Sequence, residues 1–103
     1  MARAVTERAL GTTCAVHEHR DYVPIEVHHI HPTGLNGPDI PSNRVKLCAN
    51  GHGSVHLYLS LLIKHEGVVP WSTGRRYGKR VRDLARQGYD AWRSTQGATE
   101  VTP

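Results

Sequence analysis

The chain has 103 residues, of which 38% are hydrophobic, with no Phe and two Trp, so we expect one small domain with a thin core. Its formal net charge of +4 favours an anionic partner without naming one. An apolar run of roughly 18 residues and a signal-peptide pattern are both missing, which argues against a membrane span and predicts a soluble, cytoplasmic protein. Two cysteines are too few for a disulfide framework and are better explained as metal ligands or buried thiols.

The first 12 residues show no clear apolar period, and we expect them to form an N-terminal arm or a weakly ordered helix ahead of a core at residues 13–71. Cys14 and His17 have C-x-x-H spacing, which can bring both side chains onto one zinc ion in a tight turn. His19 follows two residues later. Without a second half-site, a buried thiol beside an exposed histidine explains the pair equally well.

Residues 22–30 alternate in the manner of a strand. Ile25 and Val27 fall on one face of this strand, and Glu26 and His28 fall on the other. Glu26 is therefore either a hydrogen-bond partner of His28 or an exposed strand glutamate.

Residues 31–42 are rich in Gly, Pro, Asn and Asp, which predicts a long loop without regular structure. Long loops in small domains are usually functional or disordered, and we favour function because this one leads from His29 to Asn43. His31 either contacts phosphate or merely starts the loop. Residues 44–47 predict a second short strand whose apolar side chains face inward.

A helix is predicted from about residue 51 to about residue 65, with Gly67 as its C-cap. His52 and His56 are four residues apart and therefore share one face of this helix. Its buried stripe recurs at helical spacing and consists of Val55, Leu59, Leu62 and Ile63.

Residues 72–94 predict a basic amphipathic C-terminal helix, centred on residues 75–92 and weakened by Gly78 and Gly88. Seven Lys or Arg side chains and two acidic ones lie between Arg75 and Arg93. Taken alone, such a row of basic side chains is usually the solvated face of a helix. The tail at residues 95–103 is expected to be disordered.

Two adjacent histidines at a strand end, an asparagine before the next strand and two histidines on a helix follow one another at defined intervals. They are His28, His29, Asn43, His52 and His56. Together with the order strand, loop, strand and helix, this pattern resembles the HNH endonuclease (ββα-metal) family over residues 14–63. The resemblance implies a small α+β fold with a two-stranded hairpin and a helix, and a metal-dependent DNA endonuclease that hydrolyses phosphodiester bonds.

In that family the first histidine of the pair binds the metal and the second is the general base. The resemblance therefore implies that His28 is a ligand and His29 the base, a role that suits an imidazole near neutral pH. Asn43 matches the residue that fixes the loop and orients the base. His52 matches the final ligand, and His56 resembles an additional ligand of colicin-type nucleases. The implied cofactor is one divalent ion, either Mg, Mn, Ni or Zn.

Many members of the family also hold a structural zinc ion between two C-x-x-C pairs. In this chain Cys14, His17 and Cys48 match three of those ligands, and Gly51 stands where the fourth should be. His19 or water could complete the set, or the site could be vacant, since structural zinc is almost always four-coordinate.

The segment around Trp71 and the basic helix resemble, more loosely, small HNH proteins of actinobacterial phages. This implies a role in DNA packaging in a bacterial host cell, with a terminase as partner. Beside a nuclease motif the basic helix predicts phosphate contacts, and a non-catalytic, metal-stabilised DNA-binding module remains the alternative. That alternative has no use for an unliganded His29 beside Asn43. The candidate DNA-binding side chains are Arg75, Lys79, Arg82 and Arg86.

Overall fold

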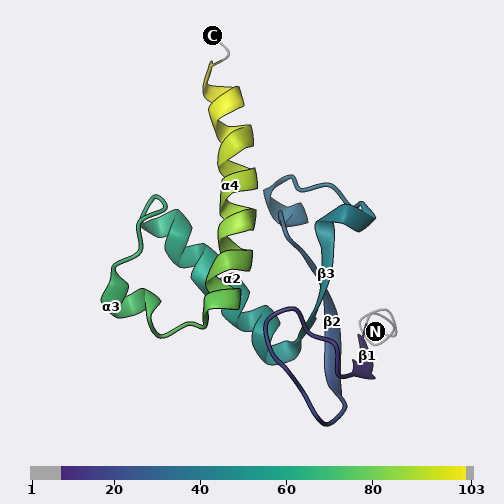
Figure 1. Cartoon of the computed structure of the whole chain (residues 1–103). Coiled ribbons are helices and arrows are strands. Elements are labelled where there is room, and N and C mark those ends of the chain that lie inside the picture. Colours follow the sequence, from purple (N-terminus) through teal and green to yellow (C-terminus); the bar gives the residue numbers. More distant parts are fainter. Residues whose placement is uncertain (1–7, 102–103) are drawn as a thin grey trace.

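The computed structural model describes residues 8–101, with the side chains of residues 10–96. It contains a three-stranded antiparallel sheet in the order β1-β2-β3, accompanied by helices (Figure 1). The elements are β1 (Arg8–Gly11), β2 (Val23–His29), β3 (Arg44–Cys48), α2 (Ala49–Lys64), α3 (Trp71–Gly74) and α4 (Lys79–Val101). The predicted α+β class, with a hairpin, a helix and a basic C-terminal helix, is confirmed.

Strand β1 is an element that the sequence did not predict. Residues 8–11 pair with β2, with Ala9 opposite Ile25, so the expectation of an arm or a weak helix is wrong for these four residues. An edge strand this short can be held by main-chain hydrogen bonds and leaves no apolar alternation to detect. Residues 1–7 of the expected arm lie outside the described residues.

The β2–β3 hairpin turns toward helix α2 the face that carries Glu26 and His28. Directly opposed residues of an antiparallel pair lie on the same face, and the register places Glu26 opposite Leu47 and His28 opposite Val45. Leu47 is fully buried, whereas Val27, on the other face, is 46% exposed. The alternation was therefore predicted correctly, and the side that packs inward is the one with a glutamate and a histidine.

The loop between the two strands is more regular than predicted. It contains two short 3-10 helices, η1 (Thr33–Leu35) and η2 (Pro41–Asn43). His31 is buried, and its Nε2 donates a hydrogen bond of 2.8 Å to the carbonyl of Leu35. His31 therefore supports the loop from inside.

Helix α2 begins at Ala49, about two residues before its predicted start, because Cys48 caps it. The Cys48 Sγ accepts a hydrogen bond of 3.2 Å from the amide of Gly51. At the other end the amide of Gly67 bonds the carbonyl of Leu62 at 2.7 Å. Gly67 (φ 91°), which was predicted as the C-cap, is left-handed, but the left-handed turn begins one residue earlier, at Glu66 (φ 55°). The predicted stripe faces the core, where Tyr58 joins Val55, Leu59 and Leu62 as a buried residue.

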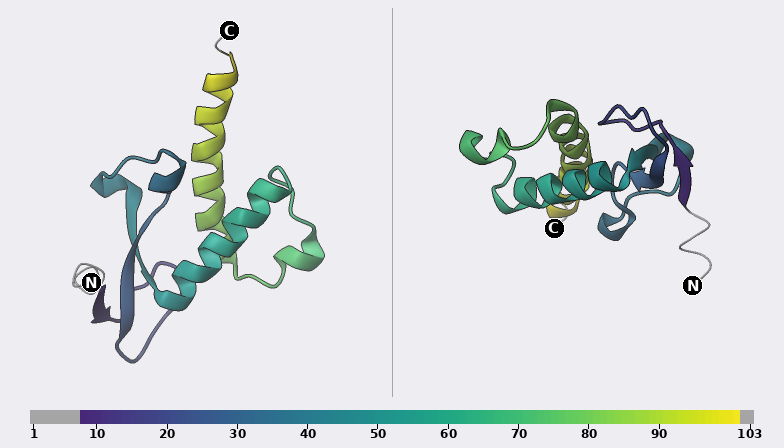
Figure 2. Two further views of the ribbon diagram at one scale, coloured as in Figure 1. Left: turned by 180° about the vertical axis from the view of Figure 1, so that it is seen from behind. Right: turned by 90° about the horizontal axis from the view of Figure 1, so that it is seen from below.

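Helix α4 crosses α2, and its C-terminal part projects from the rest of the fold (Figures 1 and 2). It begins at Lys79, after the separate short helix α3, and continues to Val101, past residue 94 where we expected it to end. Gly88 does not interrupt it. A Cβ atom at Gly88 would lie 2.2 Å from the carbonyl oxygen of Ile30, so the glycine lets α4 pass over the end of β2. Among residues 8–101, no helix is long and apolar enough to cross a membrane.

Candidate metal centre and adjoining site

Three histidines from two separate elements meet where β2 faces the first turns of α2. His28 comes from the strand, and His52 and His56 come from the helix. Their candidate ligand atoms all lie within 4.8 Å of one another. His28 is only 1% exposed, and neither of its ring nitrogens has a hydrogen-bond partner. A buried polar group without a partner costs about 1–3 kcal/mol, so the donor set fits a bound cation.

The spacing and protonation of these imidazoles suit metal binding. The Nε2 atoms of His52 and His56 lie 3.1 Å apart, and two nitrogens bound tetrahedrally to one zinc ion at about 2.0–2.1 Å would be separated by about 3.3 Å. Burial, together with the three neighbouring imidazoles, lowers the pKa of His28 to about 3. Burial and His52 also lower the pKa of His56. Neutral imidazole is the form that binds a metal ion.

Glu26 fixes the orientation of one of these rings. Its Oε1 lies 2.6 Å from Nδ1 of His52, so the structure pairs it with His52 and not with His28, the partner considered from the sequence. A carboxylate that accepts the Nδ1 hydrogen leaves the Nε2 lone pair of His52 facing the cluster. Such carboxylate–histidine pairs commonly orient metal-bound imidazoles.

His29 lies beside this cluster on the opposite face of β2. It lines an open pocket of about 310 Å³ together with His52, His56 and the start of the η1 loop. Its Nε2 lies 2.8 Å from Oδ1 of Asp39, a contact that the sequence did not predict. His29 therefore reaches the same open space as the histidine cluster while bonding a carboxylate instead of joining the cluster.

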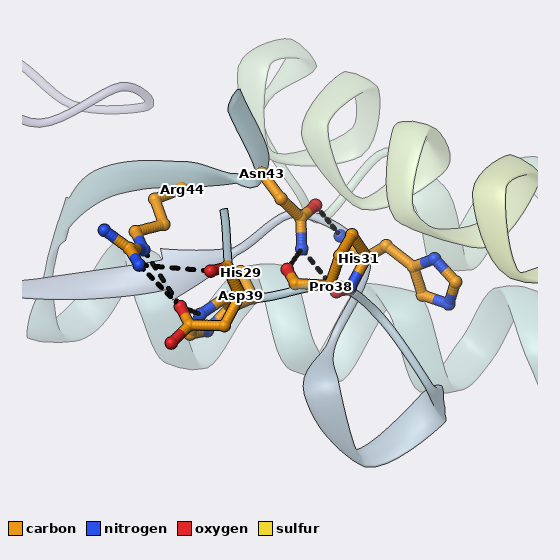
Figure 3. Close-up of polar contacts among 6 residues, drawn as sticks. All are labelled: His29, His31, Pro38, Asp39, Asn43 and Arg44. Atoms are coloured by element: carbon orange, nitrogen blue, oxygen red, sulfur yellow. Dashed lines mark hydrogen bonds and ion pairs between the residues drawn. The ribbon is translucent and has the colours of Figure 1, made fainter. Parts of the chain in front are cut away.

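Asn43 fixes the loop, as expected, but does not bond the imidazole of His29. Its Oδ1 accepts a hydrogen bond from the amide of His31 at 2.9 Å, and its Nδ2 donates to the carbonyls of His31 (2.9 Å) and Pro38 (2.7 Å) (Figure 3). Its carbonyl also accepts the amide of Ile30 at 2.8 Å. Asn43 thus joins the start of the loop to its end. In the described part of the chain, the side chain that bonds the His29 ring is Asp39.

A second group of possible ligands consists of Cys14, His17, His19 and Cys48. Nδ1 of His17 lies 3.2 Å from Sγ of Cys48, and the amide of Cys48 donates to Sγ of Cys14 at 3.2 Å. Nε2 of His19 is buried without a hydrogen-bond partner. The structure thus brings His19 to the group as a fourth donor, and His52 remains with the other cluster.

Gly51 lies directly beside the two sulfur atoms. A Cβ atom there would be 3.4 Å from each Sγ and 2.6 Å from Cγ2 of Val16, so the position borders the group without supplying a donor. Burial raises the pKa of Cys48. Burial also opposes ionisation of Cys14, but main-chain N–H donors, that of Cys48 foremost, lower its pKa overall. A thiol with a lowered pKa is the better metal ligand of the two.

Three of the four predicted DNA-binding side chains contact other side chains or main-chain groups of the protein. Arg82 donates to the carbonyl of Tyr77 and lies over the ring of Trp71. Arg86 donates to the carbonyl of Gly67 at 2.6 Å. Lys79 pairs with Asp83, and Arg75 is exposed.

The described residues therefore hold an open group of three histidines and a more enclosed group of two cysteines and two histidines. Donors that leave a pocket open suit a reactive ion, whereas four converging donors suit a structural one. No protein-family model, curated protein or solved structure was found to match the chain.

Proposed function

We propose that the chain is a metal-dependent DNA endonuclease of the ββα-metal (HNH) class, with His28, His52 and His56 as the ligands of one divalent ion. The observation that carries the proposal is the fully buried His28, whose two ring nitrogens have no hydrogen-bond partner beside two helical histidines. A cation bound by these three side chains would compensate the burial of His28.

In this proposal each residue has a distinct task. His29, which lines the pocket without joining the ligand group, accepts a proton from the attacking water. Glu26 holds the ring of His52, and Asn43 holds the loop that closes one side of the pocket. A divalent ion bound by the three histidines would supply a Lewis acid for the phosphate and the departing 3′-oxygen.

A second ion, structural zinc, is proposed for Cys14, His17, His19 and Cys48. The support is the convergence of four donors and the buried, unpartnered Nε2 of His19. A non-catalytic DNA-binding module would use this ion but would leave the open histidine group unexplained. Phage DNA packaging with a terminase is the proposed context and rests on sequence resemblance alone.

The decisive experiment is plasmid cleavage by the purified protein after treatment with EDTA and after adding back Mg, Mn, Ni or Zn. We expect no cleavage with EDTA and cleavage with at least one of these ions. His28→Ala should abolish both cleavage and binding of the ion. His65→Ala, which removes an imidazole from the far end of α2, is the matched control and should behave as the parent. Cleavage that persists in EDTA, or in His28→Ala, would contradict the proposal.

DNA contacts are expected from cations that the fold leaves free. In the described part of the chain, no hydrogen bond or ion pair to the side chains of Arg75 and Arg76 is present, and both are exposed. If both contact phosphate, the double variant Arg75→Gln/Arg76→Gln will reduce the slope of log K against log salt by up to about 1.8, or about 0.9 for each contact. Its melting temperature should stay near that of the parent.

The matched variant Arg82→Gln/Arg86→Gln removes the same charge but also the contacts to Tyr77 and Gly67. It should therefore lower the melting temperature. DNA-binding isotherms at several salt concentrations and thermal melting separate the two effects. An unchanged salt slope for Arg75→Gln/Arg76→Gln would show that these cations do not contact DNA.

A further inference from the structure

The side chain of Asp39, in the loop between β2 and β3, contacts the side chains of His29 and Arg44. One of its carboxylate oxygens, Oδ1, lies 2.8 Å from Nε2 of His29, 3.0 Å from Nε of Arg44 and 2.9 Å from Nη2 of Arg44 (Figure 3). His29 and Arg44 are direct cross-strand partners of β2 and β3, so their side chains start from the same face of the sheet. The carboxylate therefore ties together two neighbours that the hairpin has already aligned.

The main chain on both sides of Asp39 is fixed, although its side chain is 66% exposed. On one side the carbonyl of Pro38 accepts Nδ2 of Asn43 at 2.7 Å. On the other side the carbonyl of Ile40 accepts the amide of Asn43 at 2.9 Å, and Pro41 restricts the conformation of the residue before it. The loop that Asn43 anchors thus presents Asp39 to His29 at a defined place.

We infer that Asp39 is a positioning residue for His29, and that its carboxylate, held by Arg44, fixes the hydrogen on Nε2 and leaves Nδ1 as the proton-accepting atom. The inference rests on the proposed function for its catalytic meaning. An ionised carboxylate can only accept a hydrogen bond, so the imidazole must donate to it through Nε2–H.

The protonation state of Asp39 supports this arrangement. The hydrogen bond from His29 and the contacts from Arg44 lower the pKa of Asp39, so the carboxylate is ionised at neutral pH. When the O–H bond of the attacking water breaks, its proton passes to Nδ1 of His29, and the oxygen forms its bond to phosphorus as the 3′-oxygen departs. The resulting imidazolium keeps its Nε2–H bond to the carboxylate, whose negative charge stabilises it.

The tautomer can be measured without any assay of cleavage. Long-range ¹H–¹⁵N correlation spectra of the full-length protein, recorded with zinc above neutral pH, distinguish protonated from unprotonated ring nitrogens of histidine. We expect hydrogen on Nε2 of His29 in the parent and a mixture of tautomers in Asp39→Ala. A parent spectrum with hydrogen on Nδ1, or an unchanged spectrum in Asp39→Ala, would overturn the inference.

Kinetics give a second, separate test. Partners that orient metal-bound imidazoles typically contribute about 10–100-fold. We expect the same scale for the partner of His29, so Asp39→Ala should lower kcat by that factor with KM for DNA unchanged or reduced. Asp39→Asn keeps an oxygen that can accept from Nε2–H while facing Arg44 but lacks the negative charge, and should recover part of the rate. Asp21→Ala, which removes an exposed acid before the other end of β2, is the charge-matched control and should leave kcat unchanged.

The outcomes separate this inference from the proposed function. The expected tautomers without any metal-dependent cleavage would refute the nuclease and leave the positioning of His29 intact. Cleavage by the parent at an undiminished kcat in Asp39→Ala would refute the positioning role and leave the nuclease intact.

Discussion

Replacement of His29 by alanine will lower the cleavage rate at saturating DNA by about 10²–10⁴-fold, the usual contribution of a general base. The reason is that His29 lines the pocket but is not among the three side chains whose nitrogen atoms converge. Its loss removes a proton acceptor and no metal ligand. Single-turnover cleavage together with calorimetric titration of the divalent ion will measure the two effects independently.

His28→Ala is the counterpart of this variant from the adjacent position of β2. It should lose both cleavage and ion affinity, because His28 lies inside the ligand group and His29 lies outside it. The predicted division of labour between the two neighbours would be wrong if His29→Ala also lost the ion. It would equally be wrong if His29→Ala cleaved DNA at the parent rate.

Local periodicity was enough to predict the elements that carry the histidines. The alternation in β2 and the recurring apolar residues of α2 gave the hairpin and the helix, with limits correct to a few residues. Features set by contacts between distant segments were missed. Strand β1 attaches through its backbone to β2, and Gly88 looked like a helix breaker because its close approach to Ile30 cannot be read from neighbouring residues.

The candidate site likewise has residues that could be predicted from the sequence and residues that could not. The resemblance to the HNH family implied a ligand group of His28, His52 and His56, and the structure does bring these side chains together. Asp39 was missed because its place beside His29 depends on the path of a twelve-residue loop. The composition of a loop predicts that it is irregular but does not predict where its side chains lie. The fourth ligand of the group of Cys14, His17 and Cys48 was left undecided for a related reason. Only the folded turn shows that His19 reaches this group.

The two possible metal centres share the first turn of α2. Cys48 caps the helix through Sγ, and His52, four residues later, belongs to the histidine group. Four residues are about one helical turn. An ion held by Cys48 and its neighbours would therefore fix the start of the helix that presents His52, so a stability effect and an activity effect are expected from one structural ion.

Cys48→Ser tests this ion with little disturbance of the helix itself. Serine is a preferred N-cap residue and can still accept the amide of Gly51, but its hydroxyl is not among the usual ligands of structural zinc. At a metal concentration about 1,000 times the Kd, a bound ion stabilises the folded state by about 4 kcal/mol. At about 4–8 °C per kcal/mol for a domain of this size, the variant should melt about 16–32 °C lower than the parent.

His19→Ala separates the ion from the cap, because His19 has no part in capping α2. We expect it to lose about one zinc ion per chain and to fall in melting temperature toward Cys48→Ser, whereas His65→Ala should retain both metal and stability. Metal analysis after mild chelation and thermal melting with and without EDTA provide the measurements. If His19→Ala kept its zinc and its melting temperature, the buried Nε2 of His19 would not be a ligand. If the parent itself melted identically with and without EDTA, Gly51 would mark a site that the chain has lost.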